Sequence, residues 1–505
     1  MTRFPSHLSD DFNALIELLR ARGVRDLRLD SRLIERGDAF IAVPGRSVDG
    51  RDFIEQAAAR GAAAVLIEAD GWSSRHAGVA VLPLNGLTAD LGRLAAAWYG
   101  EPSGALLSVG VTGTNGKTSC SQWIAQALSA SGRPCGVIGT LGSGFPGQLH
   151  DAGLTTPDAV SLQRVVRTLA DDGARALAME VSSIGLDQGR VDGMRFDIAV
   201  FTNLTRDHLD YHGTMDAYAQ AKARLFDWPT LSHAVLNLDD VFGRQLAHSL
   251  QARAHAPRLI GYTMSGAQDA GTVRILRATA LRATATGQTF TLDAGGERAE
   301  VEVGLVGAFN VANLLAVTGT LLAAGLSLAE AAVLLPRLSP PPGRMQCIGG
   351  SGQPLAVIDY AHTPDALAQA LSALRPVAQA RGGALWVVFG AGGDRDPGKR
   401  APMGAAAAAA DRIVITSDNP RSEDPAAIAA QVAAGLPAAA MARTLIERGV
   451  AIDTALAEAD ARDVVLIAGK GHETYQETRG VRSPFSDVAR ASAALAARAG
   501  RERAA

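Results

Sequence analysis

The feature that most constrains this 505-residue chain is a glycine-rich turn between an apolar segment and a helical one. Residues 106–111 are predicted to form a short strand, and residues 118–129 carry apolar side chains at the spacing of one buried helix face. The turn reads Gly113-Thr114-Asn115-Gly116-Lys117-Thr118-Ser119. Its backbone N–H groups and the helix start favour an anion. Lys117 would reach the outer phosphates of a nucleotide, and Thr118 would hold Mg²⁺.

One position departs from the strict phosphate-loop pattern. That pattern has glycine at position 111, whereas this chain has Val111, with Gly110 one place early. The alternative is an ordinary glycine-rich strand-to-helix turn. Because Lys-Thr-Ser opens the helix in the expected context, the sequence favours a nucleoside triphosphate site.

Length and composition narrow the class of protein. A chain of this length predicts about three domains. Lys and Arg total 48 against 51 Asp and Glu, and only 5% of residues are aromatic, which argues against a nucleic-acid groove. The three scattered cysteines predict neither a disulfide framework nor a metal cluster. Without an apolar leader or an apolar run long enough for a membrane span, we expect a cytoplasmic protein.

Alternating strand-like and helix-like segments predict an α/β protein of three domains. Residues 1–104 are expected to form a small N-terminal α/β domain. Residues 105–336 would form a central doubly wound parallel sheet around the phosphate loop, with β-rich structure at 272–303. Residues 337–505 would form a C-terminal Rossmann-like α/β domain. Its candidate strands are 355–359, 384–389, 412–416 and 463–468.

Polar residues follow the predicted strands, where open α/β sheets bind ligands. Glu180 closes one strand and His208 follows another, and near a phosphate-loop lysine this pair suits Mg²⁺. Considered alone, Glu180 is more typical of a paired surface carboxylate, His208 of a loop histidine and Lys222 of a solvated helix lysine. Four polar loops of the C-terminal domain suggest a second ligand surface. They are 359–362, 392–396, 417–421 and 469–473.

The ordered motifs of the chain resemble those of the Mur ligases of peptidoglycan synthesis. They are LDSR, GTNGKTS, TTP, EVSS, DQGRV, TNLTRDHLDYHG, AKARLF, FNVANLL, PGRMQ, DYAHTPDAL, GGDRDPGKR, DNPR and AGKGHE. One motif alone would be weak, whereas the full set in order is specific and covers the chain from end to end. The resemblance implies a domain for UDP, a domain for ATP and a mobile C-terminal domain that brings the amino acid.

The resemblance also implies roles for matching positions. Gly113 to Ser119 match the ATP loop. Positions that match adenine and ribose contacts are Asn310, Asn313 and Arg344. Positions that match UDP-sugar contacts are Leu29, Ser31, Arg46, Ser47 and Val48. Positions that match contacts to the muramoyl dipeptide are Thr155, Thr156, Ser182, Gln188 and Arg190.

The remaining matches concern the metal and the incoming amino acid. Thr118, Glu180 and His208 match Mg²⁺ ligands, and Lys222 matches the lysine that the family carbamylates. The match to the diaminopimelate pocket comprises Arg395, Asp418, Asn419, Pro420, Arg421, Gly469 and Glu473. On residue types alone, 418–421 equally suit a turn that caps the next helix and leaves Arg421 in solvent. Ile184 stands where many relatives have histidine, so any contact of that imidazole is absent.

The implied reaction is an ATP-dependent amide ligation. A D-glutamyl carboxylate of UDP-N-acetylmuramoyl-L-alanyl-D-glutamate attacks the γ-phosphate of ATP, and meso-2,6-diaminopimelate attacks the acyl phosphate. The expected catalytic residues are Lys117, Glu180, His208 and Lys222, with Mg²⁺ and a CO₂-derived carbamate on Lys222 as cofactors. We expect only these small molecules as partners, no nucleic acid, no membrane span and a monomer.

Other classes of protein remain open. A lysine-adding ligase and a folylpolyglutamate synthetase-type ligase perform similar chemistry; DNPR argues against the first, and the LDSR-containing N-terminal domain argues against the second. A nucleotide-switch or transport ATPase would hydrolyse ATP without both substrates. A catalytically dead UDP-sugar binder is disfavoured because Lys117, Glu180, His208 and Lys222 are all present.

Overall fold

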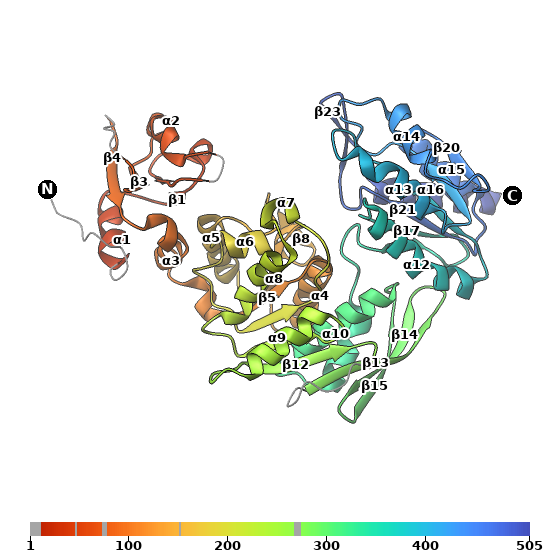
Figure 1. Ribbon diagram of the computed structural model, residues 1–505, viewed down its shortest axis with the longest axis horizontal. Helices are drawn as coiled ribbons and strands as arrows, with labels where there is room; N and C mark the ends of the chain where they lie inside the picture. The colour runs from red at the N-terminus through yellow and green to blue at the C-terminus, as the bar shows by residue number, and fades with distance from the viewer. Residues whose placement is uncertain (1–11, 46–47, 73–77, 151–152, 267–273, 505) are drawn as a thin grey trace. The chain divides into compact units, whose positions relative to one another are not determined.

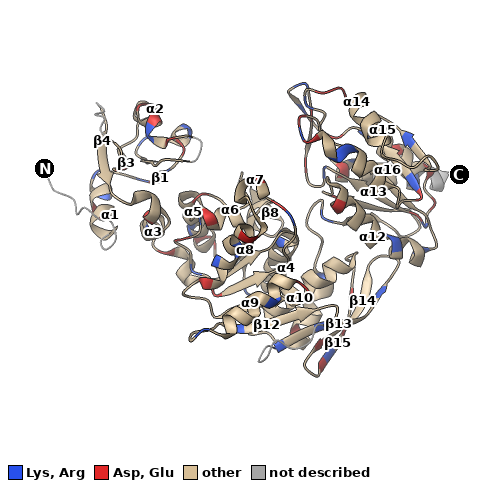
Figure 2. Ribbon diagram, in the orientation of Figure 1, with Lys and Arg blue, Asp and Glu red and all other residues tan. Residues whose placement is uncertain are grey.

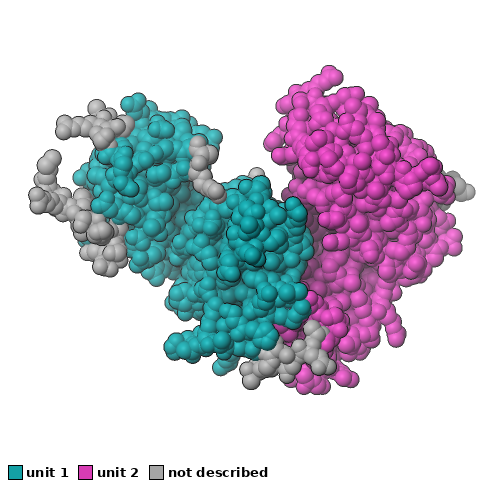
Figure 3. Space-filling view, in the orientation of Figure 1, with its two compact units in different colours: residues 1–117, 128–236, 240–259 teal, residues 118–127, 237–239, 260–505 magenta. Residues whose placement is uncertain are grey.

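The computed structural model describes residues 12–45, 48–72, 78–150, 153–266 and 274–504. Two compact units make up the chain (Figure 3). The first comprises residues 1–117, 128–236 and 240–259, and the second comprises 118–127, 237–239 and 260–505. The limits of the three expected domains stay predictions. Of the expected UDP-sugar contacts, Arg46 and Ser47 lie outside the described residues.

The N-terminal part of the first unit is a small parallel α/β sheet (Figure 1). Its strands in spatial order are β1 (Leu27–Arg28), β2 (Ala39–Ala42), β3 (Ala64–Glu68) and β4 (Ala80–Leu84). Its helices are α1 (Phe12–Ala21), α2 (Ile54–Ala59) and α3 (Leu87–Trp98). Alternate strand residues point to opposite faces, so Ile41 packs with Leu15 and Leu94 on one face, and Phe40 with Ile54 on the other.

The rest of the first unit is built around a parallel sheet whose middle strand leads into the phosphate loop. Its strands are β5 (Leu107–Thr112), β6 (Cys135–Gly139), β7 (Gly142–Phe145), β8 (Gln148–His150), β9 (Ala176–Glu180), β10 (Ile198–Phe201) and β11 (His233–Asn237), in the order β11-β10-β5-β9-β6-β7-β8. Five of these strands are parallel and almost wholly buried, which is expected where a parallel sheet is covered on both faces. They are β5, β6, β9, β10 and β11. The short strands β7 and β8 extend the sheet beyond β6 by antiparallel pairing, with β8 at the edge, which the sequence did not predict.

Helices alternate with these strands along the chain and carry several of the expected site residues. They are α4 (Lys117–Ala130), α5 (Ala159–Asp171), α6 (Ser183–Asp187), α7 (Leu209–His212), α8 (Met215–Ala223) and α9 (Val241–Gln251). Helix α5 also joins the N-terminal sheet to the central one. Its Val160 belongs to the same apolar cluster as Leu27, and Arg164 Nε donates to Asp26 Oδ2 at 2.8 Å.

Strands β12 to β15 are counted in the same eleven-stranded sheet as β5 to β11, and the second unit also contains a separate six-stranded sheet. Strands β12 (Arg258–Thr263), β13 (Arg274–Ala283), β14 (Gln288–Ala294) and β15 (Glu297–Val303) follow one another in space, with antiparallel pairing from β13 onward. This confirms the β-rich prediction where residues are described. Helices α10 (Ala308–Ala323) and α11 (Leu328–Leu334) come next. Helix α10 is buried along most of its length, which explains why its sequence is apolar all round.

The C-terminal sheet has the order β16-β17-β21-β18-β19-β20. These strands are β16 (Gln346–Gly349), β17 (Leu355–Asp359), β18 (Leu385–Phe389), β19 (Arg412–Ile415), β20 (Ala442–Thr444) and β21 (Val464–Ala468). Its helices are α12 (Pro364–Arg381), α13 (Arg400–Ala407), α14 (Pro425–Ala433), α15 (Arg448–Glu458) and α16 (Asp487–Ala504), and a hairpin of β22 (Tyr475–Thr478) and β23 (Val481–Pro484) follows β21. The four predicted strands agree with β17, β18, β19 and β21 to within one residue. Only β16 is antiparallel to its neighbour.

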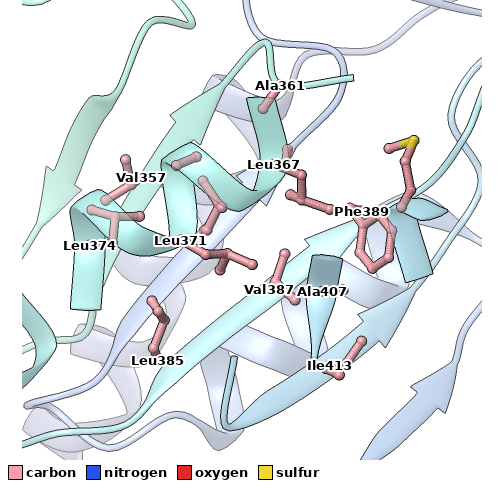
Figure 4. Packing of buried hydrophobic residues seen from close by; sticks show 14 of the residues in the cluster. Val357, Ala361, Leu367, Leu371, Leu374, Leu385, Val387, Phe389, Ala407 and Ile413 are labelled. Carbon is pink, nitrogen blue, oxygen red and sulfur yellow. The ribbon is translucent and has the colours of Figure 1, made fainter. Parts of the chain in front are cut away.

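Buried aliphatic side chains hold this last sheet to its helices. Figure 4 shows Leu371 and Leu374 of α12 lying over Val357 and Val387 of the sheet, with Phe389 at the strand end. Charged residues of both signs are scattered along the ribbon (Figure 2). Within the part of the chain that the structure describes, every helix falls short of the length and apolar character needed to traverse a bilayer.

Candidate active site

The phosphate loop joins the end of β5 to the start of α4. Gly113 has a φ of 144°, and a Cβ there would lie 1.9 Å from Thr202 Oγ1, so no other residue fits. The segment after β10 holds the loop, because Thr114 N donates to Asn203 O at 2.8 Å and Asn115 N to Asn203 Oδ1 at 2.9 Å. Val111 is a buried residue of β5, so the missing glycine falls in the strand and leaves the turn intact.

Lys117 begins helix α4 beside this loop. Its Nζ donates to Gly113 O at 3.0 Å and to Thr114 O at 2.9 Å. The next two residues, Thr118 and Ser119, are 7% and 8% exposed in the first turn of the helix. A helix start with an ammonium group and hydroxyl groups beside a glycine turn is suited to polyphosphate.

Lys222 is buried, contrary to the alternative of a solvated helix lysine. Its side chain is 1% exposed, and its Nζ donates to Gly113 O at 2.8 Å and lies 4.3 Å from the ring centroid of Tyr218. Burial, and then the charge of Lys117, hold the pKa of Lys222 well below its ordinary value. This lowered pKa favours the neutral, nucleophilic form of an amine that is hydrogen-bonded to the phosphate loop.

Glu180 closes β9 next to the phosphate loop, because β9 pairs with β5. The side chain is 1% exposed, and Thr140 donates to both of its oxygens, from N at 2.8 Å and from Oγ1 at 3.2 Å. A Cβ at Gly139 would lie 2.2 Å from Glu180 Oε1, so a larger residue there would displace the carboxylate. A surface carboxylate is excluded.

His208 lies in the same unit but in a different environment. Its side chain is 44% exposed, with Nε2 3.5 Å from Asp207 Oδ2, and its backbone has a φ of 50°. Positive φ at a non-glycine residue is strained and is common at functional positions. Its ring centroid lies 6.1 Å from that of Tyr218, which in turn contacts Lys222.

The donor set fits Mg²⁺ bound largely through phosphate. Among the described residues, no three His, Cys, Asp or Glu side chains converge as a ready-made metal cage. Mg²⁺ usually takes one or two protein carboxylates, several waters and substrate phosphates. The fixed carboxylate of Glu180 meets that requirement.

The structure brings together all five residues expected to bind the muramoyl dipeptide. Thr155 contacts Thr140 through their Oγ1 atoms at 3.0 Å, and Thr156 Oγ1 donates to Ser182 Oγ at 3.1 Å. Arg190 Nη1 donates to Thr156 O at 2.8 Å, and Arg190 Nε donates to Gln188 Oε1 at 2.9 Å. Thr140 also holds Glu180, so the dipeptide residues are coupled to the carboxylate beside the phosphate loop.

Three aromatic residues of this region were not singled out from the sequence. Tyr211 OH donates to Asp187 Oδ2 at 2.8 Å, and His212 Nε2 lies 2.9 Å from Ser183 Oγ. Tyr218 lies 3.1 Å from Thr114 Oγ1 and supports Lys222. The only signal for Tyr211 and His212 is their place in the same TNLTRDHLDYHG segment as His208. Half-buried Ile184 lies between Ser183 and Gly185 in α6.

The N-terminal candidates are less enclosed. Ser31 is 5% exposed, and its Oγ donates to Gln56 Oε1 at 2.6 Å. Leu29 is half-buried against the sheet core, while Val48 is 54% exposed. Leu29 and Ser31 directly follow β1, so they lie at the carboxyl edge of this small sheet.

The expected adenine and ribose residues lie in the second unit. Asn310 and Asn313 are 3% and 7% exposed in α10, and Asn313 Nδ2 donates to Asn310 Oδ1 at 3.3 Å. Arg344 packs on Tyr360, with Cζ 4.9 Å from the ring centroid. Its buried Nε has no hydrogen-bond partner among the described residues, which leaves a donor for a ligand.

The C-terminal candidates meet around the ends of β19 and β21. Asn419 Nδ2 donates to Glu473 Oε2 at 2.8 Å. A Cβ at Gly469 would lie 2.4 Å from Asp418 Oδ2, and the φ of Gly469 is 115°, so only glycine fits beside that carboxylate. Arg395 is exposed on the neighbouring loop.

Arg421 is held in an unusual backbone conformation. Its φ is 51°, and its backbone is fixed to the β22–β23 hairpin, where Arg421 N donates to Glu477 O at 3.0 Å. Its side chain is half-buried, and Nη1 donates to Gly393 O at 2.7 Å. The next helix, α14, is capped by Asp424. The alternative of a helix-capping turn with Arg421 in solvent is therefore wrong.

Comparisons with known proteins agree along the whole chain. Residues 24–99 match the Mur ligase family catalytic domain, 111–321 the Mur ligase middle domain, and 343–471 the Mur ligase glutamate ligase domain. A UDP-N-acetylmuramoyl-L-alanyl-D-glutamate–2,6-diaminopimelate ligase of Janthinobacterium sp. (strain Marseille) is 51% identical over 481 residues, 94% of each chain. The ligase of that name from Ectopseudomonas mendocina (strain ymp) is 52% identical over 476 residues, 94% of this chain and 95% of its own.

A solved structure of a ligase with the same name is similar in fold. It has a TM-score of 0.71 and 39% sequence identity, and the alignment covers 94% of this chain and 95% of that one. The family-model matches, the sequence identity to relatives and the similarity in fold all point to the same family. The chain belongs to the Mur ligase family.

Proposed function

We propose that the chain catalyses the ATP-dependent addition of meso-2,6-diaminopimelate to UDP-N-acetylmuramoyl-L-alanyl-D-glutamate, releasing ADP and phosphate. The names of relatives that are about half identical over 94% of the chain support this substrate pair. The structural observation that carries it is the link of Thr155 to the Glu180 carboxylate through Thr140, together with the direct hydrogen bond from Thr156 Oγ1 to Glu180 O, beside the phosphate loop. That arrangement suits a peptide carboxylate presented to a nucleotide.

The first step activates the D-glutamyl carboxylate. Its oxygen attacks the γ-phosphorus of ATP, the bond to ADP breaks, and an acyl phosphate forms. Arg190 is suited to a substrate carboxylate because a guanidinium can donate two parallel hydrogen bonds, and the Nε and Nη2 donors that now share Gln188 Oε1 would supply them. Lys117 and the loop N–H groups would neutralise charge on the phosphates. Catalysis of this kind depends on positioning and on electrostatic stabilisation.

The cofactors we propose are Mg²⁺ and a carbamate on Lys222. The neutral amine would add to CO₂ through a new N–C bond and release one proton to water, so that a buried anion would replace the neutral amine. Glu180, His208, Thr118 and the Lys222 carbamate would hold the metal, which supplies charge neutralisation to the phosphates. The suppressed protonation of Lys222 and its place beneath Gly113 support this assignment.

The second step forms the amide. The amine of diaminopimelate attacks the acyl carbon, phosphate leaves with the bridging oxygen, and the nitrogen gives up a proton. The pocket formed by Arg395, Asp418, Asn419, Pro420, Arg421, Gly469 and Glu473 would orient the amino acid. Arg421 has donors left for a carboxylate, since only its Nη1 is bonded among the described residues. We further propose that the protein acts as a monomer in the cytoplasm.

The test is phosphate release in a complete mixture and in mixtures that lack one component. The proposal expects release only when ATP, the UDP-muramoyl dipeptide and diaminopimelate are all present. Sustained release with ATP alone would favour a switch or transport ATPase and would contradict the proposal. A product carrying lysine or glutamate in place of diaminopimelate would favour one of the other ligases.

A further inference from the structure

Lysine is scarce in this chain, and its positions are informative. Lys and Arg total 48 residues, yet only four are lysine: Lys117, Lys222, Lys399 and Lys470. Arginine therefore supplies nearly all the ordinary surface cations. Arginine and lysine are not interchangeable where a compact ammonium must fit between acceptors. Lys117 and Lys222 already have such positions at the phosphate loop, which directs attention to Lys470.

Lys470 is fully buried between two residues of the proposed amino-acid pocket. Its side chain is 0% exposed, with Nζ 3.0 Å from Asn419 Oδ1 and 3.0 Å from Glu473 Oε2. The face of Tyr475 lies 5.6 Å from the same Nζ. A buried ammonium is costly unless it is paired and hydrogen-bonded. Here it forms a closed triangle, because Asn419 Nδ2 also donates to Glu473 Oε2.

This triangle uses both polar side-chain atoms of Asn419 but only one carboxylate oxygen of Glu473. Glu473 Oε2 accepts from both Lys470 and Asn419, whereas no donor among the described residues reaches Glu473 Oε1. Asn419 Oδ1 also accepts from Glu477 N at 2.9 Å. Glu477 belongs to the hairpin that fixes the backbone of Arg421. Lys470 thus connects the carboxylate, the amide and the hairpin.

A second buried charge pair contacts the backbone where the loops 417–421 and 469–473 begin. Arg448 and Asp487 are both 0% exposed and are joined by two hydrogen bonds, at 2.6 and 2.7 Å. Arg448 Nη2 also donates to Ala468 O at 2.9 Å, at the end of β21. Arg448 is thus paired with Asp487, and Lys470 is paired separately with Glu473.

We propose that Lys470 is a positioning residue of the amino-acid pocket, which orients Glu473 so that Oε1 faces an ammonium group of the incoming amino acid. The inference rests on the proposed function, because it concerns the pocket assigned to diaminopimelate. Without Lys470, the carboxylate of Glu473, whose side chain is 21% exposed, would turn to solvent. The pocket would then lose its acceptor for the ligand cation while the nucleotide site stays unchanged.

The experiment compares Lys470→Met with wild type in the full-length enzyme. We expect the KM for diaminopimelate to rise roughly 10- to 100-fold, as for loss of one partner of a desolvated charge pair. The KM for ATP should change less than about twofold, since the two sites use separate residues. An unchanged KM for diaminopimelate in the folded variant would overturn the proposal.

Two further variants separate positioning from general destabilisation. Leu374→Ala removes a buried side chain of the same unit away from the pocket (Figure 4) and should lower stability without raising the KM for diaminopimelate. Glu473→Gln and the double variant Lys470→Met/Glu473→Gln should have similar KM values, because Lys470 acts through Glu473. Additive losses would contradict the proposal. The double variant, which removes both charges together, decides the question if Lys470→Met does not fold.

The two proposals fail in different ways. Wild type that does not turn over with diaminopimelate contradicts the proposed function. Lys470→Met is then assayed with whichever amino acid wild type accepts, and the proposal for Lys470 fails only if the KM for that amino acid is unchanged.

Discussion

The phosphate loop and the amino-acid pocket are built by different means. The phosphate loop relies on backbone geometry: Gly113 has no room for a side chain, and Asn203 holds the neighbouring N–H groups. The amino-acid pocket relies on charged side chains, with Arg421 and Asp394 held at positive φ on its loops. Backbone dipoles suit any polyphosphate, whereas placed charges discriminate between amino acids. Activation of the substrate carboxylate and selection of the amino acid therefore depend on different residues, and single substitutions can affect one without the other.

The largest effect is expected at the phosphate loop. Lys117→Ala should raise the activation free energy by about 3 kcal/mol or more, because a positive charge that stabilises the transferring phosphoryl group is lost. Turnover should therefore fall at least about a hundredfold. The fold should persist, since Lys117 Nζ donates to two carbonyls of the loop itself, at Gly113 and Thr114. Circular dichroism and phosphate release test this. Near-normal turnover by the folded variant would remove the loop from the reaction.

Lys222→Ala should lose most activity and regain part of it with added short carboxylic acids. The space left by the side chain lies beneath Gly113, where an exogenous carboxylate would replace the carbamate anion. Activity is measured with and without acetate, using Lys117→Ala as a control that acetate should not rescue. Full activity without acetate would exclude a carbamate at this position.

Arg421→Ala should affect amino-acid use without affecting the nucleotide site. Loss of one partner of a desolvated charge pair costs ~2–5 kcal/mol, or very roughly 30-fold to several thousandfold in kcat/KM for diaminopimelate. Lysine lacks the distal carboxylate, so its use should hardly change. Both amino acids are assayed with wild type and variant. Equal losses for the two, or no loss for either, would remove Arg421 from the specificity pocket.

The smallest effect concerns stability and pH. Because the folded-state pKa of Lys222 is lowered, the unfolded state binds more protons between that pKa and the ordinary lysine value. Stability in this window should therefore rise with pH, by at most about 1.4 kcal/mol per unit from this group. Urea unfolding of wild type and Lys222→Met in CO₂-free buffer isolates the contribution. Parallel pH profiles for the two proteins would contradict it.

Local chemistry and buried strands could be predicted from the sequence. The strands β17, β18, β19 and β21 appear as continuous apolar runs because helices cover both faces of a parallel sheet. The phosphate loop was found because its glycines, lysine and hydroxyls are adjacent in the chain. The strands β7 and β8 were not predicted, since such short segments carry too little hydrophobic periodicity to indicate a strand.

Features that depend on distant contacts could not be predicted. Lys222 looks like a helix-surface lysine until α8 packs against Gly113, which is 109 positions away in the sequence. The triangle of Lys470, Asn419 and Glu473 likewise joins two loops that follow different strands. The positive φ of Arg421 arises from its pairing with the hairpin, which no local propensity indicates.

The most direct test is to follow a carboxylate oxygen of the substrate into the released phosphate. It asks whether activation of the carboxylate persists when selection of the amino acid is impaired. The D-glutamyl carboxylate that reacts is labelled with ¹⁸O in both positions, and released phosphate is analysed by mass spectrometry. Attack on ATP followed by attack of diaminopimelate on the acyl carbon leaves one labelled oxygen in each phosphate. We predict this transfer in the complete mixture, retained in the slow turnover of Arg421→Ala. Release of unlabelled phosphate during formation of the tripeptide product would contradict the account.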